Sequence, residues 1–358
     1  MISEVWIRNF KSLRDVRIGL ERFTIFVGPN ASGKSSVLQA MHAVCRNFIQ
    51  GNINANEDVE IRQAQSRDAK EPVELSAKSQ GQWFRYRMPI AINTNFPGGF
   101  PGGFGGQTPG LSFRVAGPTP EGNDLKVWQP KAASDLLPQS VILQLEASKL
   151  IPPSVNNQGN QGNQTTMAPD GTGIHFALSS MALNEPDTWQ ELQADLRSII
   201  PTVRRLRHSK VPHGQIAQLL FDTVGADSLT ANQVSEGTLL VLGMLAGLYA
   251  PDRPNLILLD DLDRGLHPKA QKDLIALLRK LLDRNPNLQI AATTHSPYML
   301  DCMEPEEVRM TCLDESGATV CDSIEKHPKF EKWKDEMAPG ELWSLFGEKW
   351  LLERKVAA

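Results

Sequence analysis

The sequence predicts an α/β fold that is built on a largely parallel sheet and preceded by antiparallel strands. Three observations predict it: an alternating polar and apolar pattern opens the chain, short continuous apolar runs recur along it, and helical segments separate those runs. A strand buried on both faces has a continuous apolar sequence, and such strands alternate with helices in parallel sheets. With 358 residues, the chain is long enough for one large domain or two of medium size.

The expected elements follow in chain order. Residues 5–20 alternate apolar with polar side chains and predict two half-buried strands. Phe23–Val27 predicts a strand buried on both faces, and a glycine-containing turn leads from it into a helix over Lys34–Phe48. The later pattern predicts strands within 57–92 (notably 73–75 and 83–90) and at 141–145, 203–208, 215–221, 256–259 and 288–292, and helices at 186–200, 235–249 and 268–282.

Composition and charge limit the function classes. The chain has 37 Lys and Arg against 41 Asp and Glu, so we expect any DNA contact to be a local patch and not a bulk-charge effect. Four cysteines show neither a CxxC pair nor zinc spacing, which favours a reduced, cytoplasmic protein. No secretory signal opens the chain, and its longest nearly apolar run, 239–250, is shorter than the ~20 residues that span a bilayer.

Two stretches of biased composition interrupt the chain. Residues 96–110 are mostly Gly and Pro, and residues 152–164 are rich in Asn, Gln and Gly, so both are expected to be loops. The role of both stretches stays open, and one alternative for residues 96–110 is contact with a partner protein. The predicted organisation is a head over 1–322, made of an N-terminal lobe 1–95, insertions within 96–173 and a C-terminal lobe 174–322, followed by a tail 323–358.

The tail is rich in tryptophan. Trp333, Trp343 and Trp350 lie within a short segment of Glu and Lys residues. Large aromatic side chains serve as anchors at protein interfaces, but they also attach terminal segments to a core. We favour attachment to the core and keep a partner dock as the alternative.

The strongest motif follows the first buried strand and matches the pattern G-x-x-x-x-G-K-[ST]. In such a loop the glycines let successive N–H groups face phosphates, and the helix N-terminus adds positive potential. Lys34 would contact the β- and γ-phosphates and assist catalysis, and the Ser35 hydroxyl would bind Mg²⁺. The predicted ATP-binding residues of this loop are Gly28, Pro29, Asn30, Ala31, Ser32, Gly33, Lys34, Ser35 and Ser36.

Three further motifs lie in the second half. Asp260 ends an apolar strand, where a carboxylate can be directed to Mg²⁺. The segment Ser235-Glu236-Gly237-Thr238 begins an apolar helix, although helix capping alone would explain it. His295 follows another buried strand within Thr293–Pro297, where a lone histidine can also be structural.

Together with Ile7–Leu13, these motifs resemble those of ABC-type ATPases in the branch that includes RecF, SMC heads and the OLD-family ATPases. The resemblance spans about Met1 to Val308. It implies an ABC-type P-loop ATPase head with a mixed, mostly parallel sheet, flanking helices and an N-terminal antiparallel β subdomain. It also implies a head-to-tail homodimer with two buried ATP molecules, each held by the phosphate loop of one copy and by Ser235 and Gly237 of the other. Asp260 and Ser35 would bind Mg²⁺, and His295 would be the switch histidine.

The chain departs from this family at the residue after Asp260. The family has a Glu there that orients or deprotonates the attacking water, whereas Asp261 is one methylene shorter. A misplacement of ~1 Å can cost on the order of 100-fold in rate. We therefore expect slow hydrolysis with Asp261 as the catalytic carboxylate, and Asp263 as the second choice. Gln63 is the candidate for the family's glutamine loop, and a surface polar residue explains it equally well.

The expected function is an ATPase without a TOPRIM nuclease domain. The segment after Glu307 is shorter than the ~100–200 residues of such a domain and lacks its clustered carboxylates. We expect this ATPase to regulate a separate effector protein, such as a nuclease or toxin, in a bacterial defence or toxin-type system. The alternative is a RecF-like DNA-binding repair ATPase, which DNA-stimulated hydrolysis would favour.

Overall fold

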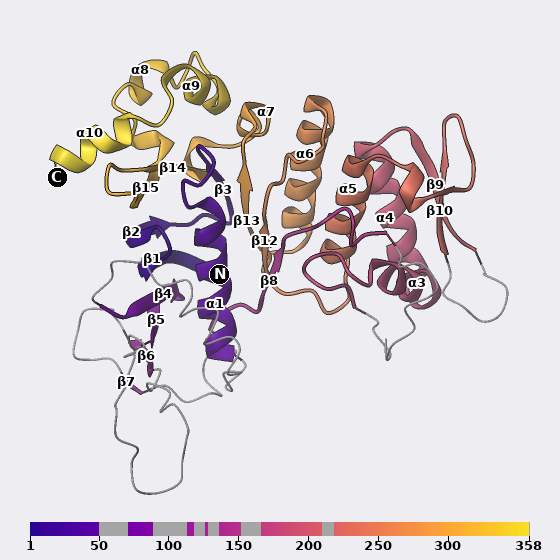
Figure 1. The fold of residues 1–358 in the computed structure, drawn as a ribbon, viewed down its shortest axis with the longest axis horizontal. Helices are drawn as coiled ribbons and strands as arrows, with labels where there is room; N and C mark the ends of the chain where they lie inside the picture. Colours follow the sequence, from indigo (N-terminus) through magenta and orange to yellow (C-terminus); the bar gives the residue numbers. More distant parts are fainter. Residues whose placement is uncertain are drawn as a thin grey trace, which may run out of the picture.

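The computed structural model describes residues 1–49, 71–88, 113–117, 126–127, 136–151, 166–209 and 218–357. These residues form successive layers: an antiparallel sheet, the helix α1 (Lys34–Ile49), a largely parallel central sheet, and a second group of helices (Figure 1). The α/β architecture that the sequence predicts is therefore confirmed.

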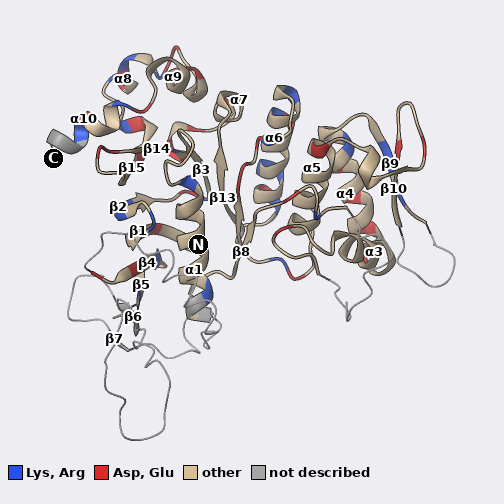
Figure 2. Ribbon diagram, viewed as in Figure 1, with Lys and Arg blue, Asp and Glu red and all other residues tan. Residues whose placement is uncertain are grey.

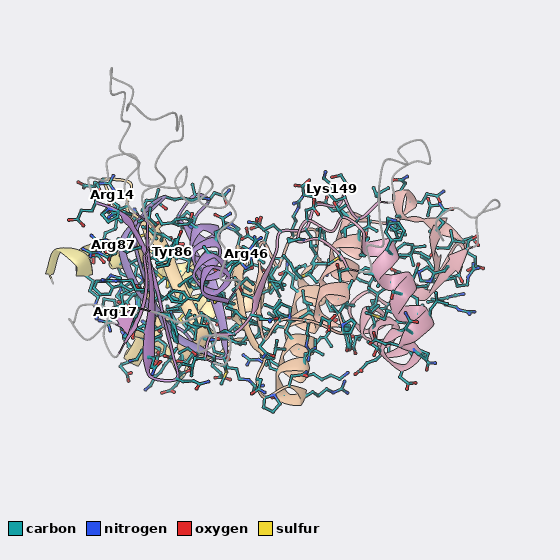
Figure 3. The ribbon with its side chains drawn as sticks, turned by 90° about the horizontal axis from the view of Figure 1, so that it is seen from below. Arg14, Arg17, Arg46, Tyr86, Arg87 and Lys149 are labelled. Carbon is teal, nitrogen blue, oxygen red and sulfur yellow. The ribbon has the colours of Figure 1, made fainter. Side chains whose placement is uncertain are left out.

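The antiparallel sheet contains the first strands of the chain. Its described strands are β1 (Ile2–Phe10), β2 (Leu13–Gly19), β4 (Val73–Ser79), β5 (Gln82–Met88), β6 (Phe113–Gly117) and β7 (Lys126–Val127), in the spatial order β2-β1-β4-β5-β6-β7. Buried and more exposed residues alternate along β1 and β2, because one face packs on α1 and the other does not. Tyr86 faces α1, and the neighbouring Arg87 lies on the outer face of the sheet together with Arg17 (Figure 3).

The central sheet contains β3 (Phe23–Val27), β8 (Ser140–Leu143), β12 (Leu256–Leu259), β13 (Gln289–Thr294), β14 (Val308–Leu313) and β15 (Thr319–Ser323), in the order β15-β14-β3-β13-β12-β8. All of these pairings are parallel except that of β15 with β14. Strands β3, β12 and β13 are buried along their whole length. Because parallel strands end at the same edge, the loops that follow these three strands meet there.

The second group of helices covers the other face of the central sheet. It consists of α3 (Ile174–Asn184), α4 (Pro186–Ile199), α5 (Glu236–Leu248) and α6 (Pro268–Arg284), which share one apolar core with the sheet (Figure 1). A small antiparallel sheet of β9 (Val203–Ser209), β10 (Gln218–Thr223) and β11 (Leu229–Thr230) extends beside them, and the 3-10 turn η2 (Ala231–Gln233) leads into α5. Helix α5 is buried from Gly237 to Ala246, in agreement with its nearly uniform apolar sequence.

The C-terminal segment packs back onto the core. It contains α7 (Pro297–Leu300), η3 (Pro305–Glu307), η4 (Ile324–Lys326), α8 (Phe330–Trp333), α9 (Pro339–Phe346) and α10 (Trp350–Ala357). Leu342, Trp350 and Leu351 are buried in the same cluster as α5 and α6, and Trp333 and Trp343 pack against that cluster. The aromatic side chains of the tail therefore attach it to the core.

Some expectations fall outside what the structure describes. The stretches 96–110 and 152–164 lie outside the described residues, and the division into lobes ending at 95 and 322 stays a prediction. All four cysteines are free thiols. Within the described ranges, none of the helices combines the length and the apolar character needed to cross a membrane.

Candidate functional site

The loop between β3 and α1 has the tight curvature of a phosphate-binding loop. Gly28, Ala31 and Gly33 have positive φ angles of 151°, 61° and 99°. A Cβ atom on Gly28 would lie 2.1 Å from the Thr311 carbonyl oxygen, and one on Gly33 would lie 2.3 Å from Thr319 Oγ1. Glycine is therefore required at both positions, for its backbone freedom and for the close approach of the β14–β15 hairpin.

Lys34 lies over this loop. Its Nζ donates hydrogen bonds to the carbonyl oxygens of Gly28 at 2.9 Å and Pro29 at 2.8 Å. Burial lowers the pKa of Lys34, and the nearby carboxylates of Asp261 and Asp260 act in the opposite direction. Both of these hydrogen-bond partners are uncharged carbonyl oxygens, and within the described residues no carboxylate forms an ion pair with this ammonium group, so the group is suited to bind an anion.

Ser35 and Asp260 meet at the carboxyl edge of the central sheet. The Ser35 hydroxyl donates to Asp260 Oδ1 at 2.9 Å, and the Thr293 hydroxyl donates to the same oxygen at 2.6 Å. The other carboxylate oxygen, Oδ2, accepts a hydrogen bond of 3.0 Å from Gln144 Nε2. Hydroxyl, carboxylate and amide oxygens are the ligands that Mg²⁺ prefers, so the residues present fit this ion.

Gln144 is a site residue that the sequence analysis missed. The glutamine proposed there, Gln63, lies outside the described residues. Gln144 directly follows β8, and its signal in the sequence was a polar residue at the end of the predicted strand 141–145. The pairing of β8 with β12 brings Gln144 next to Asp260, and the sequence did not reveal this pairing.

Asp261 lies beside Asp260 in a strained backbone position. Its φ angle is +53°, and its N–H donates to Thr293 Oγ1 at 2.8 Å. Burial, followed by repulsion from Asp260, raises the pKa of the Asp261 carboxyl. A carboxylate held in this way is available as a proton acceptor in the pocket that it lines.

Asp263 is bound to the segment that carries His295. Its Oδ1 accepts hydrogen bonds from the Thr294 hydroxyl at 2.6 Å and from the His295 N–H at 3.0 Å. These bonds fix the backbone at His295 and occupy the Asp263 carboxylate. This geometry favours Asp261 over Asp263 as the proton acceptor.

These groups surround a pocket of about 720 Å³ at the edge of the sheet, lined by Lys11, Ser12, Asn30, Ala31, Ser32, Gly33, Lys34, Ser35, Ser36, Asp261, Asp263, Arg264 and His295. Asp260 lines an adjoining pocket of about 300 Å³ with Gln144 and Glu146. The sequence analysis did not assign Lys11, Ser12 or Arg264 to the site. Lys11 belongs to the β1–β2 turn, and burial lowers its pKa.

The Ser235 motif lies at the start of α5. Ser235 is the N-cap, and its hydroxyl accepts a hydrogen bond from the Thr238 N–H at 3.3 Å. A Cβ atom on Gly237 would lie 2.2 Å from the Gly265 carbonyl oxygen. Neither Ser235 nor Gly237 is among the described residues that line the phosphate-loop pocket of the same chain.

Comparisons with known proteins agree with this geometry. The family model "AAA ATPase domain" matches residues 1–79, and the model "AAA domain, putative AbiEii toxin, Type IV TA system" matches residues 173–301. An SMC head solved with the C-winged-helix domain of ScpA aligns with a TM-score of 0.59 at 15% identity, over 91% of this chain and 98% of that chain. The chain has the fold of an SMC head, and two of its segments match models of AAA ATPase domains. A second SMC head, solved with an extended coiled coil and with the C-terminal domain of ScpA from Pyrococcus furiosus, has the same fold as this chain, with a TM-score of 0.58 at 13% identity over 94% and 100% of the two chains.

Curated relatives match shorter segments of this chain. The Septu protein PtuA of Bacillus thuringiensis is 41% identical over 71 residues, which are 20% of this chain and 17% of that protein. The "Retron Vc95 probable ATPase" of Vibrio cholerae serotype O1 biovar El Tor is 21% identical over 131 residues, or 33% and 24% of the two chains. The matched segments thus span less than a quarter of either relative.

Proposed function

We propose that this ATPase head binds Mg²⁺–ATP in the pocket beside its phosphate loop, hydrolyses it slowly, and uses it to join two copies head to tail. The observation that carries the proposal is the 2.9 Å contact of Ser35 with Asp260, next to Lys34. It places a hydroxyl, a carboxylate and an ammonium group at one edge of the sheet. Ser35 and Asp260 would hold Mg²⁺, and the bound ion would neutralise part of the negative charge of the phosphates.

The position of α5 supports a role for a second copy. Its N-terminus carries the Ser235 cap, and its first-turn N–H groups can donate to a phosphate. Because Ser235 and Gly237 do not line their own chain's phosphate-loop pocket, we assign them to the nucleotide of the partner copy. ATP would then stabilise the pair by binding both surfaces, and hydrolysis would release it.

Slow hydrolysis follows from the carboxylates. Asp261 has a raised pKa and lines the pocket, so it is suited to accept a proton from the attacking water. Its side chain is one methylene shorter than the Glu of the family that the sequence resembles. A long-lived ATP-bound pair is suited to a regulatory switch and not to rapid turnover.

The biological role proposed for this switch is control of a separate effector, a nuclease or a toxin, in a bacterial defence or toxin-type system. The matches to the Septu protein PtuA, to the retron ATPase and to a family model that names a toxin–antitoxin system support it. This ATPase would act in the cytoplasm, and its effector would respond to the ATP-bound pair.

The charge of the antiparallel sheet bears on the DNA-binding alternative. Lys and Arg outnumber Asp and Glu in its described strands, which Figure 2 colours by charge. Arg17 pairs with Glu4, Arg87 pairs with Glu74 at 3.0 Å, and Arg8 lies 3.5 Å from Glu74. These pairs neutralise only part of the positive charge, and the remaining excess of cations over carboxylates in these strands attracts a phosphate backbone, so duplex DNA belongs in the test of this function.

Solution sizing with light scattering tests the proposal. We expect the wild type to double its mass with Mg²⁺–ATP and to return to the smaller species with Mg²⁺–ADP. Lys34→Ala should bind no ATP and stay small, whereas Ser235→Arg should bind ATP normally and still stay small. A wild type with no nucleotide-dependent change in size and no ATP binding in calorimetry would overturn the proposal. Hydrolysis stimulated by duplex DNA would favour the RecF-like alternative.

A further inference from the structure

Two threonines from the β14–β15 hairpin contact the phosphate loop from behind. Thr311 lies on β14 and Thr319 begins β15, respectively 279 and 287 residues beyond Ser32 in the loop. Their exposed fractions are 0% and 3%. The function proposed above does not use either residue.

Thr311 joins the end of β3 to the middle of the loop. Its Oγ1 donates to the Val27 carbonyl oxygen at 3.2 Å and lies 2.7 Å from the Ser32 hydroxyl. Because a hydroxyl has one proton, Ser32 is the donor in the second bond. The Thr311 hydroxyl therefore accepts one hydrogen bond and donates another, and both of its partners belong to the strand–loop unit.

Thr319 forms the corresponding contact on the other side of the loop. Its hydroxyl is the donor to two acceptors, the Ser32 carbonyl oxygen at 3.0 Å and the Ser12 hydroxyl at 2.8 Å, which share its single proton. The Thr319 N–H also donates to the Ser12 carbonyl oxygen at 2.8 Å. Ser12 and Ser32 both line the phosphate-loop pocket, so the hairpin is directly bonded to two of its walls.

The two glycines of the loop allow this approach. The hairpin occupies the positions where side chains of Gly28 and Gly33 would lie, against Thr311 and Thr319 respectively. Between these contacts Ala31 is held in the left-handed region, which non-glycine residues adopt only when their surroundings enforce it. The hairpin thus braces a loop whose residues from Asn30 to Ser36 line the pocket.

We propose that Thr311 and Thr319 are positioning residues for nucleotide binding, which hold the phosphate loop in its binding conformation before ATP arrives. This proposal rests on the function proposed above, because it names residues that serve the same pocket. A preorganised loop gains affinity because no ordering cost remains at binding. Loss of either hydroxyl should therefore weaken nucleotide binding as well as lower stability.

The test compares Thr311→Val and Thr319→Val with Thr24→Val. Thr24 is a matched control on β3: it is 0% exposed, its hydroxyl donates to the Glu21 carbonyl oxygen at 3.2 Å, and it accepts from the Glu21 N–H at 2.9 Å. It lies at the end of β3 away from the loop. Thr311→Ser and Thr319→Ser keep the hydroxyl and serve as conservative variants. The measurements are calorimetric affinity for Mg²⁺–ATPγS and amide hydrogen exchange of residues 32–34 in the nucleotide-free protein.

We expect Thr311→Val and Thr319→Val to bind Mg²⁺–ATPγS about tenfold more weakly, a change of about 1.4 kcal/mol. Their loop amides should exchange faster, and the serine variants should restore both properties. Thr24→Val should lose stability with unchanged affinity and loop exchange. Wild-type affinity and loop exchange in both valine variants would overturn the proposal. If the wild type itself binds no nucleotide, the proposed function fails, and the exchange comparison alone decides whether the threonines order the loop.

Discussion

The guanidinium of Arg264 lies 2.8 Å from the carboxylate of Glu236. This ion pair connects the acidic loop after β12 with the first turn of α5, where the backbones of Gly265 and Gly237 are also in close contact. Arg264 lines the phosphate-loop pocket of its own chain, whereas Glu236 stands between Ser235 and Gly237, which we assign to the partner's nucleotide. One side-chain contact thus links two parts of the same chain, its own nucleotide pocket and the turn that we assign to the partner's nucleotide.

Breaking this charge pair should affect dimerisation more than ATP binding. The two side chains are about half exposed, and such a pair contributes at most about 1 kcal/mol, or about fivefold. We expect Arg264→Glu to weaken the ATP-dependent dimer by about that factor in sedimentation experiments at low salt. The double variant with Glu236→Arg should recover wild-type assembly. Failure of the double variant to recover it would show that the pair is not what holds the α5 turn.

Lengthening the catalytic carboxylate should accelerate hydrolysis. Asp261 lines the pocket on a backbone with a φ angle of +53°, so its reach is fixed by the length of its side chain. We expect Asp261→Glu to raise kcat at saturating Mg²⁺–ATP by about tenfold or more, since geometric errors of ~1 Å cost on the order of 100-fold. Asp261→Ala is the control and should lower it. An unchanged kcat in the glutamate variant would contradict the assignment of Asp261.

Neutralising Asp261 should stabilise the nucleotide-free protein. Its folded-state pKa is raised above the ordinary value of 3.8, so the ionised group disfavours folding once the pH exceeds that raised pKa. We expect Asp261→Asn to increase the free energy of unfolding at neutral pH by on the order of 0.5 kcal/mol, reduced by solvent screening. The gain should shrink as the pH falls through the raised pKa and vanish below 3.8, where the carboxyl is protonated in both states. Denaturant unfolding at pH 7 and pH 4 measures it, and an equal gain at both values would exclude this cause.

Gln144 should matter for catalysis although no charge is lost when it is replaced. Its amide donates to Asp260 Oδ2 at 3.0 Å and so orients the carboxylate that we assign to Mg²⁺. Loss of such an outer contact typically costs about 10- to 100-fold in metal affinity or activity. We expect Gln144→Ala to lower ATP turnover in this range and to raise the Mg²⁺ concentration needed for half activity. The exposed Gln139, just before β8, provides the control, since Gln139→Ala should leave both unchanged.

A single methyl group should loosen the tail. A Cβ atom on Gly340 in α9 would lie 2.1 Å from the Pro297 carbonyl oxygen at the start of α7. Alanine normally stabilises a helix relative to glycine, but here we expect Gly340→Ala to destabilise the fold by about 1–3 kcal/mol through this clash. Gly225, whose added Cβ would meet nothing within 4 Å, is the matched control and should tolerate alanine. Thermal unfolding compares the two, and equal melting temperatures would show that the tail adapts to the methyl group.

The sequence predicted those parts of the site that lie within one local segment. The phosphate loop could be recognised because Gly28, Gly33 and Lys34 serve backbone curvature and charge within eight residues of a buried strand. Asp260 and His295 could be proposed for the same reason, because each follows a continuous apolar strand. The central sheet was likewise predictable from the alternation of such strands with helices.

Residues that reach the site through strand order could not be predicted in this way. Gln144 acquires its position from the pairing of β8 with β12, and Lys11 from the turn that carries it to the pocket lined by the phosphate loop. Strands β14 and β15 were missed because polar threonines interrupt their apolar pattern. Those threonines contact the phosphate loop, so the polar residues that hid the two strands were themselves a sign of a functional contact.

The central sheet sets β3, from the N-terminal part of the chain, between β13 and β14, which both come much later in the sequence. A ribosome releases the chain from its N-terminus, so β3 emerges long before its two neighbours exist. An unfinished polypeptide that ends before residue 319 lacks Thr319 and cannot assemble the complete nucleotide cradle. Polypeptides from interrupted translation would therefore lack one of the contacts that we assign to the nucleotide pocket, and could not act in the switch proposed here.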